Sequence, residues 1–490
     1  MNPHNAPLYD KLMKHATGHP HSFHVPGHKM GQAFKATASH TFREIMRIDQ
    51  TEISGLDDLH HPEGVIAEAQ ELAAECFGAE ETFFLIGGST AGNLAAVLSL
   101  CGRGDKLIVQ RNVHKSVLNG LMLAGAEAVF LSPELEEQTS LATIPSLAAV
   151  EEALLKYPLA KGVLLTNPNY YGMGKCLKPY IELIHRYGKP VIIDEAHGAH
   201  YGFHSRLPET AVRHGADLVV QSTHKMLSAM TMGAMIHVNG SLVNRHSLKR
   251  TLAMIQSSSP SYPIMASLDA ARRQVHTAGG ALFEEGLASV DWFRNRMGEV
   301  KSYEVVNIRG TIAGEPDKDG LTFDPFKVVI KDTTGMMTGY ELLEAVEEYG
   351  CFGEMADPEY AVFVFSLGST MEDARALYHA LQHVAERHET IPNPRRKQVY
   401  NIPAYPAMTD PIAMGWNAND YQIKTIQLEQ AAGYLSAEMI IPYPPGIPIL
   451  YPGETVTQQT VEYLMVLRDT GAKIQGARDA SLHYIDIRYE

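Results

Sequence analysis

The sequence predicts an α/β protein whose core is a mainly parallel β-sheet. Short apolar runs alternate with stretches of helical periodicity between residues 62 and 275, which is the pattern of strands joined by crossover helices. The runs are apolar almost throughout, as expected of strands that helices cover on both faces. Polar motifs follow several of these runs, and such sheets bind their ligands at the carboxyl ends of the strands.

The expected elements follow one another in a regular order. Residues 1–60 are rich in Gly, Pro and His, and we interpret them as an extended arm that lies on another surface, in the same subunit or a neighbour. A helix is expected from residue 65, where apolar residues recur at helical spacing, to a stop at Gly78. The later strands are expected at residues 82–86, 106–109, 128–131, 162–166, 190–193 and 217–221, and the helices at 91–101, 116–124, 146–156 and 178–187.

The pattern changes beyond residue 275. Longer helical stretches and fewer strands predict a smaller α+β domain over residues 276–389. A Pro-rich, basic linker at 390–406 opens a C-terminal α+β domain. The predicted organisation is therefore an arm (1–60), a large domain (61–275), a small domain (276–389) and a C-terminal domain (390–490).

The composition excludes several classes of function. The 41 Lys and Arg residues against 56 Asp and Glu give a net charge of −15, which disfavours nucleic acid and anionic membranes as partners. No run of about 18 apolar residues is present to span a bilayer, and residues 1–12 do not form a signal peptide. The four cysteines lie far apart without a CxxC pair. We therefore expect a reducing cytoplasm, and neither a disulfide framework nor a zinc ribbon.

Two motifs that follow strands suit a flat, anionic ligand. The stretch from Gly87 to Asn93 reads Gly-Gly-Ser-Thr-Ala-Gly-Asn and precedes a helix, and its backbone, hydroxyls and helix N-terminus can hold a phosphate. The alternative is an ordinary turn that caps a helix. His114 lies just beyond the run at 106–109 and could stack on a flat cofactor, although a lone histidine is more often only a hydrogen-bonded polar residue.

Two further residues follow strands and carry charge. Asp194 comes directly after a buried run, where a carboxylate needs a metal, an arginine or a protonated ring nitrogen as its partner. His197 and His200 have a spacing that can ligate a metal, but no third ligand of matching pattern lies nearby, and we expect no metal. Lys225 lies 31 residues after Asp194, at the end of the next strand, where a Schiff base with an aldehyde would remove the buried charge.

Together these features match the needs of pyridoxal 5′-phosphate. Its phosphate needs hydrogen-bond donors, its ring needs a flat partner, its pyridine nitrogen needs a carboxylate, and its aldehyde needs a lysine. The sequence supplies all four in order at successive strand ends. We therefore predict pyridoxal phosphate as the cofactor.

The chain resembles, over nearly its whole length, the bacterial fold-type I, pyridoxal-phosphate-dependent ornithine/lysine/arginine decarboxylases. The C-terminal motifs are the most specific part of this resemblance, because other fold-type I enzymes lack them. The resemblance implies a carbon–carbon lyase of polyamine biosynthesis that decarboxylates a basic L-amino acid, with arginine slightly favoured over lysine and ornithine. The motifs that carry it are Phe23-His-Val-Pro-Gly-His28, Gly88-Ser-Thr-Ala91, Arg111-Asn-Val-His-Lys-Ser116, Asn167-Pro-Asn-Tyr-Tyr-Gly172, Asp194-Glu-Ala-His197, Ser222-Thr-His-Lys225, Tyr443-Pro-Pro-Gly-Ile-Pro448 and Pro452-Gly-Glu454.

The resemblance also implies roles for individual residues. Lys225 would bind the cofactor aldehyde, Asp194 would pair with the pyridine nitrogen, and His114 would stack on the ring. His197 would lie near the substrate, and either it, Lys225 or water would protonate the product carbon. Glu454 would face the side-chain end of a basic substrate; the alternative is a surface carboxylate after a Pro-Gly turn. The residues that would surround the phosphate and the underside of the ring are Gly88, Ser89, Thr90, Ala196, Ser222 and His224.

The resemblance implies an oligomer as well. Longer members of the family begin with a response-regulator-like domain, whereas here the arm starts at residue 1, so we expect a homodimer or a dimer-based tetramer with the active site at the interface. Other interpretations stay open. An aminotransferase, an aldolase or a desulfurase would share Asp194 and Lys225, although Cys351, the nearest desulfurase candidate, has apolar neighbours typical of a core. A metal-dependent hydrolase, or a regulator with a dead cofactor site, belongs to a different class.

Overall fold

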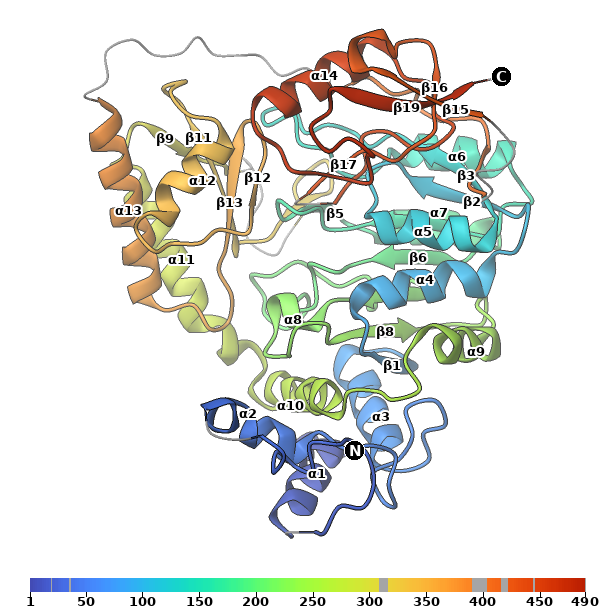
Figure 1. Ribbon diagram of the computed structural model, residues 1–490, viewed down its shortest axis with the longest axis vertical. Helices are drawn as coiled ribbons and strands as arrows, with labels where there is room; N and C mark the ends of the chain where they lie inside the picture. Colours follow the sequence, from blue (N-terminus) through green and yellow to red (C-terminus); the bar gives the residue numbers. More distant parts are fainter. Residues whose placement is uncertain are drawn as a thin grey trace. The chain divides into compact units, whose positions relative to one another are not determined.

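The chain forms two compact units, each assembled from separate segments of the sequence. The computed structural model describes residues 1–18, 20–34, 37–307, 316–389, 403–415, 422–443 and 446–489. The first unit consists of Met1–Gly102, Ala160–Asn167 and Cys176–Leu282, and the second of Arg103–Leu159, Pro168–Lys175 and Phe283–Glu490. Figure 1 labels many of the elements of both units. Among the described residues, no helix is long and apolar enough to cross a membrane.

The first unit is built on five strands in the order β1-β8-β7-β6-β4. The strands β4, β6 and β7 run parallel, and β8 runs antiparallel to β7 and β1 on either side. The strands expected here are confirmed to within two residues, but β8 is an addition. It follows β7 without a full crossover helix, and a connection that short favours an antiparallel partner. The bounds are β1 Glu81–Leu85, β4 Val163–Thr166, β6 Val191–Asp194, β7 Leu218–Gln221 and β8 Ala234–Val238.

Helices cover this sheet closely. Helix α4 (Gly88–Leu100) packs on β1, β6, β7 and β8, and α9 (Arg245–Ile255) packs on α4. A Cβ atom at Gly92 would lie 2.6 Å from Val220 Cγ1 and 2.8 Å from Leu85 Cδ1, so only glycine lets α4 approach the strands this closely. The other helices here are α3 (Val65–Phe77), against β1; α7 (Lys178–Arg186), against β6; and α10 (Tyr262–Ala278), against α3 and β1.

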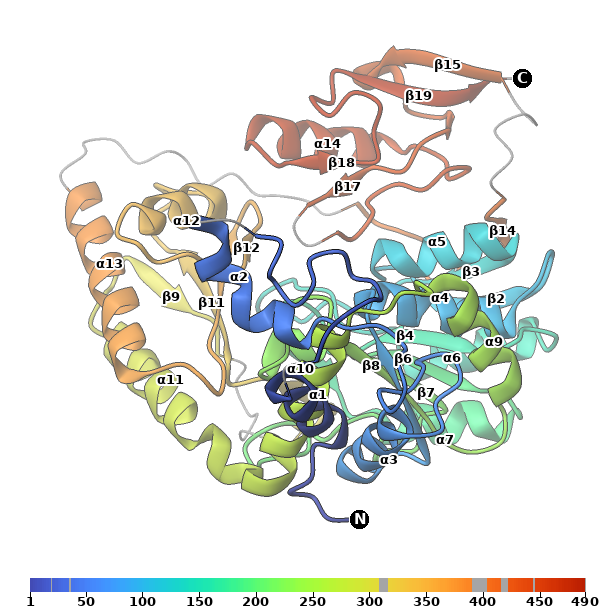
Figure 2. The same ribbon diagram turned by 60° about the horizontal axis from the view of Figure 1, so that its bottom comes forward.

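The N-terminal segment differs from the extended arm that we expected. It contains two helices, α1 (Pro7–Thr17) and α2 (Thr37–Ile48), and α1 packs on α3 and α10 of the same unit (Figure 2). The buried residues of α1 are Leu8, Leu12 and Ala16, which recur every four positions and so form one apolar stripe. The Gly, Pro and His residues that suggested an arm are concentrated after α1, and they obscured this short helical pattern.

The second unit begins with a small parallel pair of strands. Strands β2 (Lys106–Gln110) and β3 (Glu127–Leu131) run parallel, and β14 (Ile412–Ala413) pairs antiparallel with β3. The connecting helix α5 (Lys115–Ala124) and the later α6 (Leu147–Lys156) also match the expected positions.

Residues 283–389 of this unit form an antiparallel sheet with helices, as the sequence predicts. The strand order is β12-β13-β11-β9, and helices α11 and α13 lie side by side (Figures 1 and 2). The bounds are α11 Glu284–Met297, β9 Tyr303–Val305, β11 Lys327–Asp332, α12 Gly339–Glu347, β12 Met355–Ala356, β13 Tyr360–Val364 and α13 Met371–Glu389. The strands β5 (Met173–Lys175) and β10 (Leu321–Phe323) form a separate two-stranded sheet that shares a hydrophobic cluster with this one.

The C-terminal residues have a hydrophobic cluster of their own, with buried members that all lie between Leu428 and Ile487. Helix α14 (Gln458–Asp469) and the antiparallel sheet β15-β19-β16 contribute to it. The expected linker at 390–406 lies outside the described residues as far as residue 402. The strands are β15 Gln422–Gln427, β16 Leu435–Ser436, β17 Ile441–Pro442, β18 Ile474–Gln475 and β19 Tyr484–Tyr489.

Candidate active site

The first unit brings most of the predicted site residues to one edge of its sheet. Asp194 ends β6 and lies opposite Val220 in the neighbouring parallel strand β7. Lys225 follows β7 in the short helix α8 (Thr223–Met226). Because β8 is antiparallel, β1 points in the same direction as β7, so Ser89, which follows β1, reaches the same edge. The carboxyl ends of the strands therefore form the candidate site, as expected for such a sheet.

Asp194 is a buried carboxylate, only 3% exposed. Its Oδ2 accepts a hydrogen bond from Asn93 Nδ2 at 2.8 Å, and its Oδ1 accepts one from the Ala196 backbone N–H at 3.1 Å. Burial raises the pKa of Asp194, while the Asn93 bond and the charge of Lys225 act in the opposite direction. Within the described part of the chain, Asp194 has neutral donors and no ion pair. A buried carboxylate in this state fits a cationic ring nitrogen.

Lys225 lies beside a histidine. Its Nζ is 2.8 Å from His197 Nε2, and the His197 side chain is buried, 4% exposed. The two groups can share a proton at this distance, because an amine and an imidazole nitrogen can each act as donor or acceptor. The contact therefore places an acid–base group next to the amine that we predict to hold the aldehyde.

The predicted phosphate cup is formed by two strand ends. Ser89 Oγ and Ser222 Oγ lie 2.6 Å apart, on the segments that follow β1 and β7. Gly88, with φ of +69°, begins α4, so the N–H groups of the first helical turn belong to the same feature. His224 is held by a hydrogen bond from Nδ1 to the Gly233 carbonyl at 3.0 Å. Hydroxyls and a helix N-terminus fit an anionic phosphate. The remaining predicted members of the cup and ring site, Thr90 and Ala196, are exposed and half-buried, respectively.

The structure adds residues that the sequence reasoning did not assign. Asn93 fixes Asp194 and stands one helical turn after Ser89, a spacing of four that could have identified it. Thr223 lies between Ser222 and His224, and its buried Oγ1 has no hydrogen-bond partner among the described residues. An orphaned hydroxyl at this place fits a site that receives a polar ligand.

A buried polar network supports the turn after Asp194. Glu195 is fully buried, and its carboxylate accepts hydrogen bonds from Thr210 Oγ1 at 2.6 Å, Ala211 N at 2.8 Å and Gln221 Nε2 at 2.7 Å. Gln221 Oε1 in turn lies 3.1 Å from His237 Nε2. Burial raises the pKa of Glu195 to about 7 and lowers that of His237 to about 3. The network joins the segment after β6 to β7 and β8.

His114 and Glu454 belong to the second unit. His114 is the N-cap of α5, and its Nδ1 accepts from the Ser116 N–H at 3.2 Å and lies 2.8 Å from Ser116 Oγ. A Cβ atom on Gly446 would lie 3.2 Å from His114 Cδ2, so the C-terminal glycine covers the ring. The stacking role of His114 stays a prediction.

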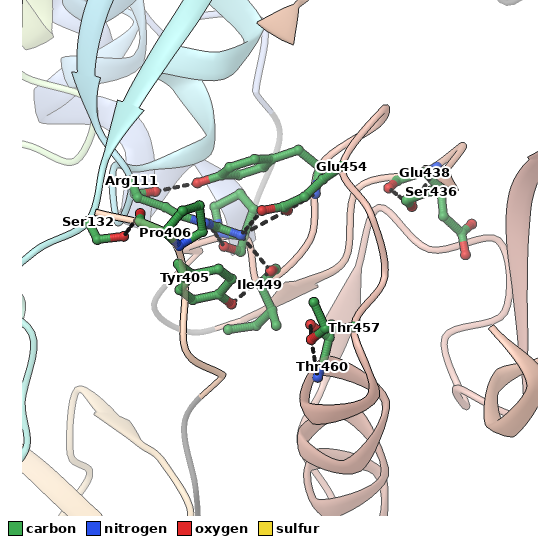
Figure 3. Close-up of polar contacts among 12 residues, drawn as sticks. Arg111, Ser132, Tyr405, Pro406, Ser436, Glu438, Ile449, Glu454, Thr457 and Thr460 are labelled. Atoms are coloured by element: carbon green, nitrogen blue, oxygen red, sulfur yellow. Dashed lines mark hydrogen bonds and ion pairs between the residues drawn. The ribbon is translucent and has the colours of Figure 1, made fainter. Parts of the chain in front are cut away.

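Glu454 has an intramolecular partner in this structure. Both of its carboxylate oxygens lie 2.9 Å from Arg111 Nη2, and the backbone N–H of Tyr451 donates to Oε2 at 3.1 Å (Figure 3). The side chains of Arg111 and Glu454 are 4% and 15% exposed, respectively. Burial raises the pKa of Glu454, against the opposing charge of Arg111. The substrate-facing role stays a prediction, and in this structure the carboxylate is paired with Arg111. Among the described residues, no group of three or more potential ligands is arranged to hold a metal ion.

The chain is similar to known families and proteins over nearly its whole length. Residues 6–373 match the major domain of the Orn/Lys/Arg decarboxylases, and residues 395–480 match their C-terminal domain. The protein YaaO of Bacillus subtilis, named as uncharacterized, is 40% identical over 96% of both chains. An arginine decarboxylase of B. subtilis is 35% identical over 99% of this chain and 98% of its own length.

The fold also has solved counterparts. The lysine decarboxylase LdcF of Francisella novicida superposes with a TM-score of 0.82 over 99% of this chain and 81% of its own, at 22% identity. The predicted fold-type I architecture, with a mainly parallel sheet and a C-terminal domain, is thereby confirmed. Enzymes of this family are pyridoxal-phosphate-dependent carbon–carbon lyases that act on basic amino acids. The chain belongs to the Orn/Lys/Arg decarboxylase family.

Proposed function

We propose that this enzyme decarboxylates L-arginine in preference to lysine and ornithine. The observation that carries the choice of arginine is the pattern of relatives. Four relatives named arginine decarboxylase are 33–36% identical over 92–99% of this chain. Relatives named lysine decarboxylase are 24–26% identical, and this chain covers 76–78% of their length.

Different residues at the sheet edge suit different parts of the cofactor. When bound, pyridoxal phosphate supplies a ring that accepts the electrons of the broken C–C bond. Asp194 holds a proton on the ring nitrogen, because its burial makes an adjacent cation favourable. Asn93 and the Ala196 N–H fix the direction of its two oxygens. Ser89, Ser222 and the first turn of α4 bind the phosphate.

Lys225 and His197 serve the aldehyde end of the cofactor and the transfer of a proton. Lys225 would hold the aldehyde of the bound cofactor through its amine. His197 Nε2, 2.8 Å from Lys225 Nζ, exchanges a proton with that amine. The pair can therefore hold a proton and move it between Lys225 Nζ and His197 Nε2.

We also propose that the active form is at least a homodimer. The segment after α1 presents Phe23 and Val25, which are 94% and 68% exposed, and the loop after Lys225 presents Met230 and Met232 at 42% and 50%. Exposed apolar side chains of this size suit a subunit interface. Cysteines that lie far apart in the sequence, without a CxxC pair, suit a reducing cytoplasm.

The test of substrate preference is a competition. The purified enzyme, loaded with pyridoxal phosphate, is given arginine, lysine and ornithine in equal amounts, and agmatine, cadaverine and putrescine are quantified. We expect agmatine to dominate by about tenfold or more, since one methylene or a guanidinium alters the fit by about 1–3 kcal/mol. Cadaverine or putrescine as the main product would overturn the assignment to arginine. Lys225→Ala is the control, and it should form none of the three products.

A further inference from the structure

We propose that the C-terminal segment 446–454 is a clamp that positions His114, and that Arg111 is the positioning residue that holds it in place. The inference rests on the proposed function in taking this chain as a pyridoxal-phosphate-dependent decarboxylase, and on the prediction that His114 stacks on the cofactor. The clamp and His114 belong to the same unit, and the contacts between them are direct. The consequence is that the C-terminal part of the chain influences cofactor binding indirectly. Arg111 holds the segment 446–454 in place, and this segment orients His114.

The guanidinium of Arg111 is the centre of the clamp (Figure 3). It donates to the carbonyls of Pro448 at 3.3 Å and Ile449 at 2.8 Å, and to both oxygens of Glu454 at 2.9 Å. Its Cζ lies 3.8 Å from the ring centroid of Tyr405 and 4.2 Å from that of Tyr451. Arginine alone offers a planar fork that can pair with a carboxylate and stack between two rings.

The backbone on both sides of His114 is also tied to the clamp. The hydroxyl of Tyr451 donates to the Arg111 carbonyl, and the Lys115 N–H donates to the Gly446 carbonyl at 3.2 Å. The ring of Tyr451 stacks on Phe130 in β3, with centroids 4.7 Å apart. The residues three before and one after His114 are therefore fixed by the segment 446–454.

The clamp contacts the His114 ring itself through Gly446. A Cβ atom there would lie 3.2 Å from His114 Cδ2 and 3.3 Å from Nε2, and Gly446 has a φ of +94°. Only glycine combines this backbone conformation with such a close approach. Because Ser116 holds Nδ1 on the other side of the imidazole, the ring has little freedom to rotate.

The balance of desolvation and attraction indicates that the Arg111–Glu454 pair positions a segment rather than adding net stability. Burying an arginine and a carboxylate costs desolvation energy that their attraction only roughly offsets, so such a pair adds little net stability. What it adds is geometric specificity, because four hydrogen bonds from one guanidinium fix one arrangement of a segment more than 300 residues away in sequence. This specificity would keep His114, the predicted cofactor-stacking side chain, in one orientation.

The experiment measures cofactor binding rather than turnover. Arg111→Met and Arg111→Lys are compared with wild type by equilibrium dialysis of pyridoxal phosphate and by the visible circular dichroism of the bound cofactor, well below the melting temperature. The matched control is Arg468→Met, which removes an arginine–glutamate pair in the same domain (Arg468 to Glu429, 3.1 Å). We expect both Arg111 variants to weaken the Kd by about tenfold and to reduce the dichroism, and the control to stay within about twofold. An unchanged Kd and dichroism in both Arg111 variants would overturn the proposal.

A double-mutant cycle tests whether Arg111 acts through His114. If it does, Arg111→Met in a His114→Ala background should add less than about twofold to the loss of cofactor affinity. A full additional tenfold loss would show that Arg111 acts elsewhere. Gly446→Ala leaves the arginine pair intact and presses on the ring, so it should weaken the Kd by itself; no effect would contradict the contact on which the clamp depends.

The failure of the clamp and the failure of the proposed function give different results. Glu454→Gln should weaken cofactor binding if the clamp is correct. A purely substrate-facing Glu454 would leave cofactor affinity unchanged and lower kcat/KM for basic amino acids alone, and this outcome would overturn the clamp. A wrong substrate assignment would appear only in the product competition, because the dialysis measurements contain no amino acid.

Discussion

The described residues include two buried arginine–carboxylate pairs that differ in how far apart their members lie in the sequence. Arg272 and Asp269 are three residues apart on α10, 2.6 Å from each other and fully buried. Arg111 and Glu454 are 343 residues apart, and Glu454 keeps 15% of its side chain exposed. The geometry of a helix brings the first pair together, whereas the second pair exists only because the C-terminal segment folds back onto the end of β2.

Each of the two pairs binds backbone groups of a neighbouring chain segment. Asp269 Oδ2 accepts from the N–H groups of Leu8 at 3.0 Å and Tyr9 at 3.3 Å, and Arg272 donates to the carbonyls of Pro3 and Asn5. A carboxylate at the free N–H groups of α1 satisfies donors that the helix cannot. Both pairs thus fix a chain segment through its backbone, one at the N-terminus and one near the C-terminus.

The largest expected effect on stability comes from breaking the fully buried pair of Arg272 and Asp269. Arg272→Met leaves Asp269 as an uncompensated buried carboxylate, so the free energy of unfolding should fall by about 3–5 kcal/mol in urea denaturation. The double variant Arg272→Met/Asp269→Leu should recover much of this, because apolar residues of similar volume replace such pairs at little cost. A loss below about 1 kcal/mol in the single variant would show that the pair is not as enclosed as its contacts indicate.

Glu195 sharpens the comparison because it is a buried carboxylate whose described hydrogen-bond partners are all neutral. Its pKa rises from 4.5 to about 7 on folding, so the native state binds the proton more tightly than the unfolded state. Its contribution to stability is therefore complete below about pH 4.5 and lost as the pH rises through about 7, a change of about 3 kcal/mol.

The measurement is urea denaturation of wild type and Glu195→Gln at about pH 5 and pH 8. Because His237 titrates in both proteins, its opposite contribution cancels in the difference. The stability of wild type relative to Glu195→Gln should be higher at about pH 5 than at pH 8. An equal difference at both pH values would mean that Glu195 has an ordinary pKa.

Breaking the pair of Arg111 and Glu454 should lower the free energy of unfolding by a smaller amount. In Arg111→Met the carboxylate of Glu454 can turn toward solvent, because it is partly exposed, so we expect a loss of about 2 kcal/mol in urea denaturation. A loss as large as that of Arg272→Met would show that Glu454 cannot rehydrate, and the distinction between the two pairs would disappear.

The smallest effect is expected at a pair whose carboxylate is exposed. Arg468, 17% exposed, contacts Glu429, whose side chain is 47% exposed, at 3.1 Å. Its replacement by Met should lower the free energy of unfolding by less than about 1 kcal/mol, because exposed pairs gain little from their attraction in water. Thermal denaturation in low and high salt provides the check: the wild-type pair should lose its small contribution at high salt.

Local patterns were sufficient for the regular elements. Strands β1 to β4, β6 and β7 and the helices between them follow from apolar runs and helical periodicity, and they lie within a few residues of their expected positions, whereas the short β5 was not expected. The exceptions have physical reasons. Helix α1 carries only three buried positions, and β8 arises where a short connection reverses the chain.

The sequence by itself determined the order of the elements and placed Asp194 and Lys225 at adjacent strand ends, because parallel strands bring their carboxyl ends to one edge. Only the tertiary structure decided which side chains contact the predicted site residues and their neighbours. Asn93 on Asp194, the network around Glu195, and Arg111 on Glu454 are contacts between distant segments. No local periodicity encodes such a contact, because it depends on how packed elements orient their side chains in space.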